Sequence, residues 1–93
     1  MKPGSYLINT ARGEVIDESA LIDALSSGQI AGAGLDVFDN EPQIDDRFRQ
    51  LTNAVLLPHL GSATTETRND MGYRVLSNLN EFFAGKDPTD KVC

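Results

Sequence analysis

Three short apolar segments divide this chain, and polar residues follow each of them. The segments span residues 5–9, 30–38 and 54–57. Apolar runs of this length between turn residues are typical of strands that are buried on both faces. A helical pattern lies between the first two strands and another follows the third. The order strand–helix–strand–strand–helix predicts a mostly parallel α/β sheet.

Capping residues and apolar periodicity predict the two main helices. Asp17 is a suitable N-cap for the first helix, which ends at Gly28. Thr64 is a suitable N-cap for the second helix, which closes at Gly85 and Pro88. Spacings of three and four residues predict an apolar face on each helix. The first face comprises Ala20, Leu21, Ala24 and Leu25, and the second comprises Met71, Val75, Leu76, Leu79, Phe82 and Phe83.

The expected fold is a partial Rossmann-type parallel sheet of about three strands and two main helices. Residues 39–50 are polar and contain an early proline, so we expect an exposed loop there. A doubly wound sheet usually has five or six strands. The sequence therefore has the pattern of a fragment of a larger α/β protein, whose unpaired strand edges favour association or partial disorder.

Composition and charge exclude several classes of function. The chain has 40% hydrophobic and 24% charged residues and a formal net charge of −6. It lacks the basic surface expected for nucleic-acid binding, and its apolar runs are too short to cross a membrane. Cys93 is the only cysteine, so we expect neither an intramolecular disulfide nor a metal-ligand cluster. These features favour a soluble cytoplasmic protein.

Arg12, Glu41 and His59 lie in the loops that follow the three expected strands. If the strands are parallel, these side chains collect at one edge of the sheet, where α/β proteins bind ligands. An arginine can bind a carboxylate through its planar fork, and a histidine can transfer a proton near neutral pH. A carboxylate beside the imidazole orients the ring. The three together predict a site that binds an anion and moves a proton.

Each of these residues also has a purely structural interpretation. Arg12 can be a solvated loop residue, Glu41 a surface carboxylate, and His59 a strand-end residue that is bonded to a backbone carbonyl. Asp36 lies inside an apolar strand, where an unpaired carboxylate is costly. It therefore needs a partner, either a protein donor or the amide of a ligand.

Three long segments of the chain resemble the signature blocks of the D-isomer-specific 2-hydroxyacid dehydrogenases. They are residues 1–13, 31–42 and 57–64, and their order and spacing also match. The likeness is greatest to glyoxylate and hydroxypyruvate reductases. The resemblance implies NAD(P)-dependent reduction of a small 2-keto acid to a D-2-hydroxy acid, in a full-length form that is a homodimer.

The resemblance also implies roles for individual residues. Arg12 matches the arginine that binds the substrate carboxylate, Glu41 the glutamate that supports the imidazole, and His59 the acid that protonates the carbonyl oxygen. Asp36 matches the aspartate that hydrogen-bonds the nicotinamide carboxamide. Residues that line the nicotinamide end of the cofactor are expected to be Thr10, Ala11, Arg12, Asp36, His59 and Gly61.

The chain matches only part of that family's two-domain enzyme. Residues 1–62 correspond to the C-terminal half of the NAD(P)-binding domain, and residues 63–93 to a helix and tail that return to a substrate domain. The G-x-G-x-x-G turn is missing, and so is the acidic residue that separates NAD from NADP, so either cofactor remains possible. We expect the isolated chain to be inactive. Two alternatives stay open: a nucleotide-sensing binding module of the corepressor type, and a truncated relic.

Overall fold

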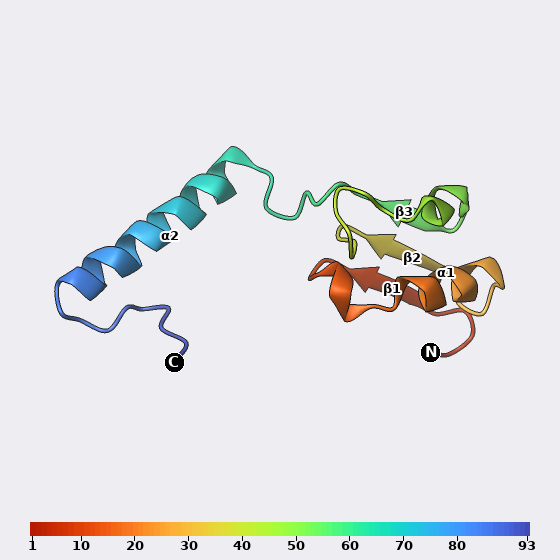
Figure 1. Cartoon of the computed structure of the whole chain (residues 1–93), viewed down its shortest axis with the longest axis horizontal. Coiled ribbons are helices and arrows are strands. Elements are labelled where there is room, and N and C mark those ends of the chain that lie inside the picture. The colour runs from red at the N-terminus through yellow and green to blue at the C-terminus, as the bar shows by residue number, and fades with distance from the viewer. The chain divides into compact units, whose positions relative to one another are not determined.

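The computed structural model describes all 93 residues as two compact units, Met1–Gly61 and Ser62–Cys93. The first unit contains a sheet of three strands, which are β1 (Tyr6–Asn9), β2 (Gly32–Leu35) and β3 (Ala54–Leu56). The strands are parallel and lie in the order β1-β2-β3 (Figure 1). The predicted partial Rossmann-type sheet is confirmed.

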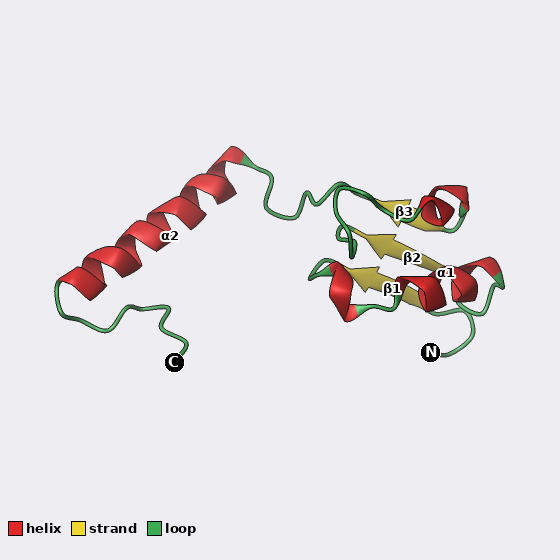
Figure 2. Cartoon of the chain, viewed as in Figure 1, coloured by secondary structure: helices red, strands yellow, loops and turns green.

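Helices connect the strands of the first unit (Figure 2). The 3-10 helix η1 (Gly13–Val15) and the helix α1 (Glu18–Ser26) link β1 to β2. A second 3-10 helix, η2 (Asp46–Gln50), precedes β3. Asp17 is the N-cap of α1, as predicted, because its Oδ1 accepts a hydrogen bond of 3.0 Å from the backbone N–H of Ala20.

The second unit consists of the helix α2 (Thr65–Phe83) and a C-terminal tail. Thr64 is its N-cap, as predicted, and the Thr64 hydroxyl accepts a hydrogen bond of 3.1 Å from the N–H of Thr67. The helix buries none of its residues, so the predicted apolar stripe is exposed. Neither α1 nor α2 has the length and hydropathy that a membrane-spanning helix requires.

The hydrophobic core lies between α1, η2 and one face of the sheet. Alternate residues of each strand point toward this face, because successive side chains of a strand point to opposite sides. Leu7, Ala33 and Leu35 therefore pack with the helices. The remaining members of this buried cluster are Leu21, Ile22, Leu25, Ile30, Phe38 and Phe48.

The opposite face of the sheet is open. The side chains of Tyr6, Ile8 and Val55 are 71%, 70% and 63% exposed. The prediction of strands buried on both faces is therefore wrong for this face, which no element of the first unit covers. Tyr6 and Ile8 lie across from Gly32 and Gly34. A Cβ at Gly34 would approach Ile8 Cδ1 to 2.9 Å, so the small residues of β2 leave room for side chains of β1.

The elements differ from the predictions at three further points. The second strand is shorter than the predicted span of 30–38, since only Gly32–Leu35 pairs with its neighbours. Ala20, which was predicted to lie on the apolar face of α1, is exposed, whereas Ile22, which was not, is buried. The predicted exposed loop at 39–50 contains η2, in which Phe48 is only 1% exposed.

Phe48 is buried because its ring packs against that of Phe38, with centroids 5.7 Å apart in an edge-to-face arrangement. Two aromatic rings thus fasten the long connection between β2 and β3 to the core. The polar residues around Phe48 concealed this contact, because the sequence gives no periodic pattern there.

We expect Phe48→Ala to lower the free energy of unfolding of the first unit by about 3–5 kcal/mol, since it removes a fully buried ring. Phe83→Ala is the matched control, because Phe83 is 81% exposed. Urea denaturation followed by circular dichroism measures both. Equal losses in the two variants would show that Phe48 does not hold the core.

Candidate active site

Three polar loops meet at the carboxyl edge of the sheet. Residues 10–13 follow β1, residues 36–41 follow β2, and residues 57–61 follow β3. Because all three strands are parallel, their carboxyl ends lie at the same edge. The candidate site residues lie in these three loops.

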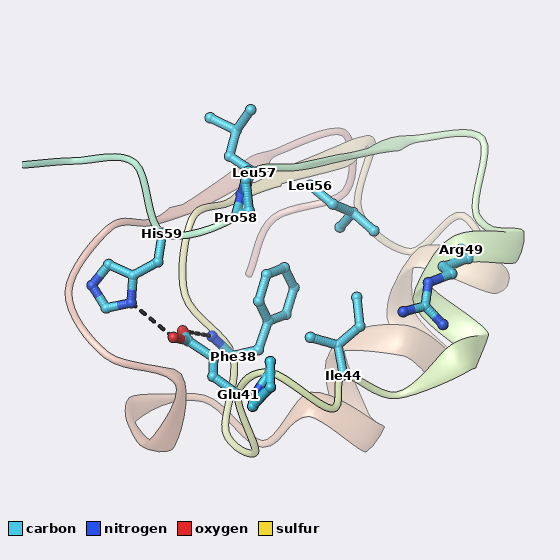
Figure 3. Close-up of a pocket in the computed structure, with 9 residues that line it drawn as sticks. Phe38, Glu41, Ile44, Arg49, Leu56, Leu57, Pro58 and His59 are labelled. Carbon is cyan, nitrogen blue, oxygen red and sulfur yellow. Dashed lines mark hydrogen bonds and ion pairs between the residues drawn. The ribbon is translucent and has the colours of Figure 1, made fainter. Parts of the chain in front are cut away.

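Glu41 and His59 form a close pair at this edge (Figure 3). Glu41 Oε2 lies 2.8 Å from His59 Nδ1. The other carboxylate oxygen, Oε1, accepts a hydrogen bond of 2.9 Å from the backbone N–H of Phe38. A carboxylate can only accept, so Nδ1 carries the proton of this bond. The second ring nitrogen, Nε2, faces away from Glu41 (Figure 3).

These contacts lower the pKa of Glu41 below its ordinary value of 4.5. The hydrogen bond from His59 is the largest cause, and the N–H of Phe38 is the second. Partial burial opposes the shift, while the charges of His59 and Arg12 add to it. Glu41 is therefore a stable anion at neutral pH and a permanent acceptor for the imidazole.

Arg12 is exposed in the loop that follows β1. Its Nη1 donates a hydrogen bond of 2.7 Å to the carbonyl oxygen of Ala11, so the guanidinium is turned toward its own loop. Its positive charge also acts on Glu41. Arg12 thus belongs to the same edge as the Glu41–His59 pair, with most of its N–H groups free to bind an anion.

Asp36 is buried, at 5% exposure, and holds the loop that carries His59. Its Oδ1 accepts from the N–H of Leu60 and its Oδ2 from the N–H of Gly61, each at 2.7 Å. The sequence left open whether its partner is a protein donor or a ligand amide. The structure supplies two protein donors, and each oxygen retains a lone pair.

His59 has a backbone φ of 57°, in the left-handed region that residues other than glycine rarely occupy. The next two residues, Leu60 and Gly61, donate their N–H groups to Asp36, and these hydrogen bonds hold the loop in that conformation. A Cβ at Gly61 would approach Asp36 Oδ2 to 3.3 Å, so a small residue suits this position. Asp36 therefore fixes the backbone from which the imidazole projects.

A hollow of about 380 Å³ opens on the Glu41 side of the pair. Its walls include the apolar side chains of Phe38, Ile44 and Leu56 (Figure 3). Nε2 of His59 faces away from Glu41, so the hollow lies on the Nδ1 side of the imidazole, where Nδ1 contacts Glu41. A reactant of His59 Nε2 must approach from the opposite side of the ring.

Two residues that help to build this edge, Asn9 and Gly13, were not singled out as site residues from the sequence. Asn9 is a polar residue that is 5% exposed at the end of β1. Gly13 is buried, and a Cβ there would lie 2.0 Å from the carbonyl carbon of Phe38. The sequence signal for Asn9 was a polar amide at the end of an apolar run, directly before the Arg12 loop. No signal in the sequence reveals the close approach at Gly13.

Comparison with known proteins identifies the family to which the chain belongs. Residues 1–61 match the sequence model of the D-isomer specific 2-hydroxyacid dehydrogenase, NAD binding domain. The chain belongs to the D-isomer specific 2-hydroxyacid dehydrogenase family. The predicted resemblance is thereby confirmed, and all three loops of the candidate site lie within the matched residues.

Individual dehydrogenases and reductases of the family are similar to nearly the whole chain. A glyoxylate reductase of Thermococcus litoralis is 52% identical over 99% of this chain. A 2-ketogluconate reductase of Gluconobacter oxydans is 53% identical over 87% of it. The chain spans only 28% and 26% of the lengths of these two proteins. It thus corresponds to about a quarter of such an enzyme.

A solved structure shares the same fold. The NADPH-dependent glyoxylate/hydroxypyruvate reductase of Sinorhizobium meliloti, in complex with NADP and malonate, superimposes with a TM-score of 0.87 at 46% identity. The superposition covers 94% of this chain and 27% of the reductase. The partial Rossmann-type sheet is therefore the corresponding part of a larger dehydrogenase fold.

We expect His59→Ala to raise the pKa of Glu41 toward 4.5, because the largest cause of its depression is removed. A carboxyl group whose pKa is lowered by folding stabilises the fold at pH values above its pKa in the unfolded chain. This contribution is lost as the pH falls through its pKa in the folded chain. His59→Ala should therefore weaken the loss of stability below about pH 4.5. Carbon-detected NMR titration of the Glu41 carboxyl measures the shift.

Asp45 provides the internal control for this titration. Its pKa is lowered by Arg47, with no contribution from His59. It should titrate identically in both proteins. An unchanged Glu41 titration in the variant would mean that the His59 contact does not stabilise the carboxylate.

Proposed function

We propose that this chain is the catalytic part of an NAD(P)-dependent reductase that converts a small 2-keto acid, of the glyoxylate or hydroxypyruvate type, to a D-2-hydroxy acid. The observation that carries the proposal is the Glu41–His59 pair of 2.8 Å, at the sheet edge that also bears Arg12. Its relatives include glyoxylate and 2-ketogluconate reductases. The active protein would be a cytoplasmic homodimer that contains the remaining length of such relatives.

The proton-transfer role belongs to His59. Glu41 accepts from Nδ1–H, so the second proton of the doubly protonated ring lies on Nε2, and Nε2 gives this proton to the carbonyl oxygen. In the reverse direction, the same nitrogen removes the hydroxyl proton. The ionised Glu41 accepts from Nδ1 in both protonation states of the ring and so holds the ring in one orientation.

Arg12 binds the carboxylate of the substrate in this proposal. A guanidinium offers paired N–H donors that match the two oxygens of a carboxylate. In the free chain one of these donors is bonded to the carbonyl of Ala11. The substrate carboxylate would compete for it and at the same time place the keto carbon beside His59.

The residues present fit the nicotinamide end of a dinucleotide. Asp36 retains one lone pair on each oxygen, which suits an amide N–H, while Ala11 and Gly61 are small enough to allow close approach. Thr10, Ala11, Arg12, Asp36, His59 and Gly61 would hold this end. NAD or NADP supplies the hydride that reduces the keto carbon. The pyrophosphate cradle of a G-x-G-x-x-G turn does not occur in these 93 residues.

The purified 93-residue chain should not oxidise NADH or NADPH in the presence of glyoxylate or hydroxypyruvate, because it lacks that cradle. Absorbance at the nicotinamide band measures the reaction. Keto-acid-dependent turnover by this chain alone would contradict the expectation and show that the missing part is dispensable.

Activity should appear when the chain replaces the matching segment of the Thermococcus litoralis glyoxylate reductase. In this chimera we expect His59→Gln to lower kcat by about 10²–10⁴-fold, since a positioned general acid is lost. Arg12→Gln should raise KM for the keto acid by about 10–100-fold, since a charge-assisted hydrogen bond is lost. Steady-state kinetics measures both.

Arg47→Lys is the matched control, because Arg47 is an exposed arginine paired with Asp45 outside the candidate site. It should leave kcat and KM unchanged. A chimera that binds NADH but reduces no 2-keto acid would contradict the proposed function and favour a binding module.

A further inference from the structure

The side chain of Asn9 bridges the loop that carries Arg12. Its Nδ2 donates a hydrogen bond of 2.8 Å to the carbonyl oxygen of Arg12. Its Oδ1 accepts a bond of 3.1 Å from the N–H of Ala11. One buried amide therefore joins the backbone on both sides of the Ala11–Arg12 peptide.

This bridge needs a donor and an acceptor in the same short side chain. Aspartate has the shape of asparagine but offers only acceptors when ionised, and leucine offers neither. Both polar atoms of the buried Asn9 side chain are bonded to this loop. The loop consequently has one preferred backbone conformation at the base of the Arg12 side chain.

The bridged loop is also seated against the loop that carries Glu41. The backbone carbonyl of Asn9 accepts a hydrogen bond of 3.0 Å from the N–H of Asp36. Gly13, at the other end of the loop, lies so close to Phe38 that a Cβ would be 2.2 Å from the nitrogen of Asp39. Phe38 in turn donates its N–H to Glu41.

We propose that Asn9 is a positioning residue that holds the Arg12 guanidinium in register with the Glu41–His59 pair. The inference rests on the proposed function and extends it to a residue that touches neither the pair nor the guanidinium. Its side chain acts on the Arg12 backbone, while its own backbone is tied to the strand end that begins the Glu41 loop. Loss of the bridge frees Arg12 without altering the Glu41–His59 contact.

The first test uses the 93-residue chain and requires no activity. Asn9→Asp removes the donor, and Asn9→Leu removes both bonds without adding a charge. We expect both variants to show lower heteronuclear NOE values at Arg12 and Gly13 in NMR spectra, and Asn9→Leu, which also loses the acceptor, to show faster amide exchange at Ala11. Unchanged order at residues 10–13 in a variant that remains folded would overturn the inference.

Asn53 provides the matched control. It too is an asparagine whose Nδ2 donates to a backbone carbonyl, that of Leu25, at 3.1 Å. It precedes β3 and therefore lies at the opposite end of the sheet. Asn53→Asp and Asn53→Leu should leave residues 10–13 ordered. Equal loosening of this loop by the Asn53 variants would attribute the effect to general destabilisation and overturn the specific role.

The second test measures kinetics in the chimera. Asn9→Leu should raise KM for the keto acid about tenfold, as expected for one misplaced hydrogen-bonding group, and should raise it no further when Arg12 is already replaced by glutamine. A rise of the same size in the Arg12→Gln background would contradict positioning of Arg12, because the effect would then not pass through the guanidinium. If the parent chimera is inactive, the proposed function fails, and the NMR comparison alone decides whether Asn9 orders the Arg12 loop.

Discussion

Parallel pairing on the central strand β2 is the constraint on which the rest of the first unit depends. Because β1 and β3 both run in the same direction as β2, three separate loops end up at one edge. Reversal of either outer strand would move its loop to the other end of the sheet. The short strands are held from one side only, where α1 and the Phe38–Phe48 contact close the core.

Much of this architecture follows from local rules. The strands, the direction of the sheet and both helix caps were predicted, because apolar runs and capping side chains act within a few residues. The predictions failed where burial depends on distant partners. Phe48 was assigned to an exposed loop because its contact with Phe38 crosses a polar segment. Tyr6 and Ile8 were assigned to a buried strand because an apolar sequence does not tell whether both faces of a sheet are covered.

The site shows the same division. Residue types and strand ends were enough to predict that Glu41 and His59 meet, and the structure joins them directly. The partner of Asp36 remained open, since a buried carboxylate accepts equally from a backbone N–H or a ligand amide. The tight packing at Gly13 could not be predicted at all, because distances between loops follow from the assembled sheet. The catalytic and cofactor-binding roles of these residues remain predictions.

The two-sided hydrogen bonding of Glu41 has a consequence for what can replace it. Its Oε1 must accept from the N–H of Phe38, so a glutamine at this position would be forced to turn its NH₂ group toward His59. The imidazole would then have to accept at Nδ1 and would carry its single neutral-state proton on Nε2. Such a ring has no basic nitrogen on the reacting side. A change of one atom in residue 41 would thus invert the tautomer of a residue eighteen positions away.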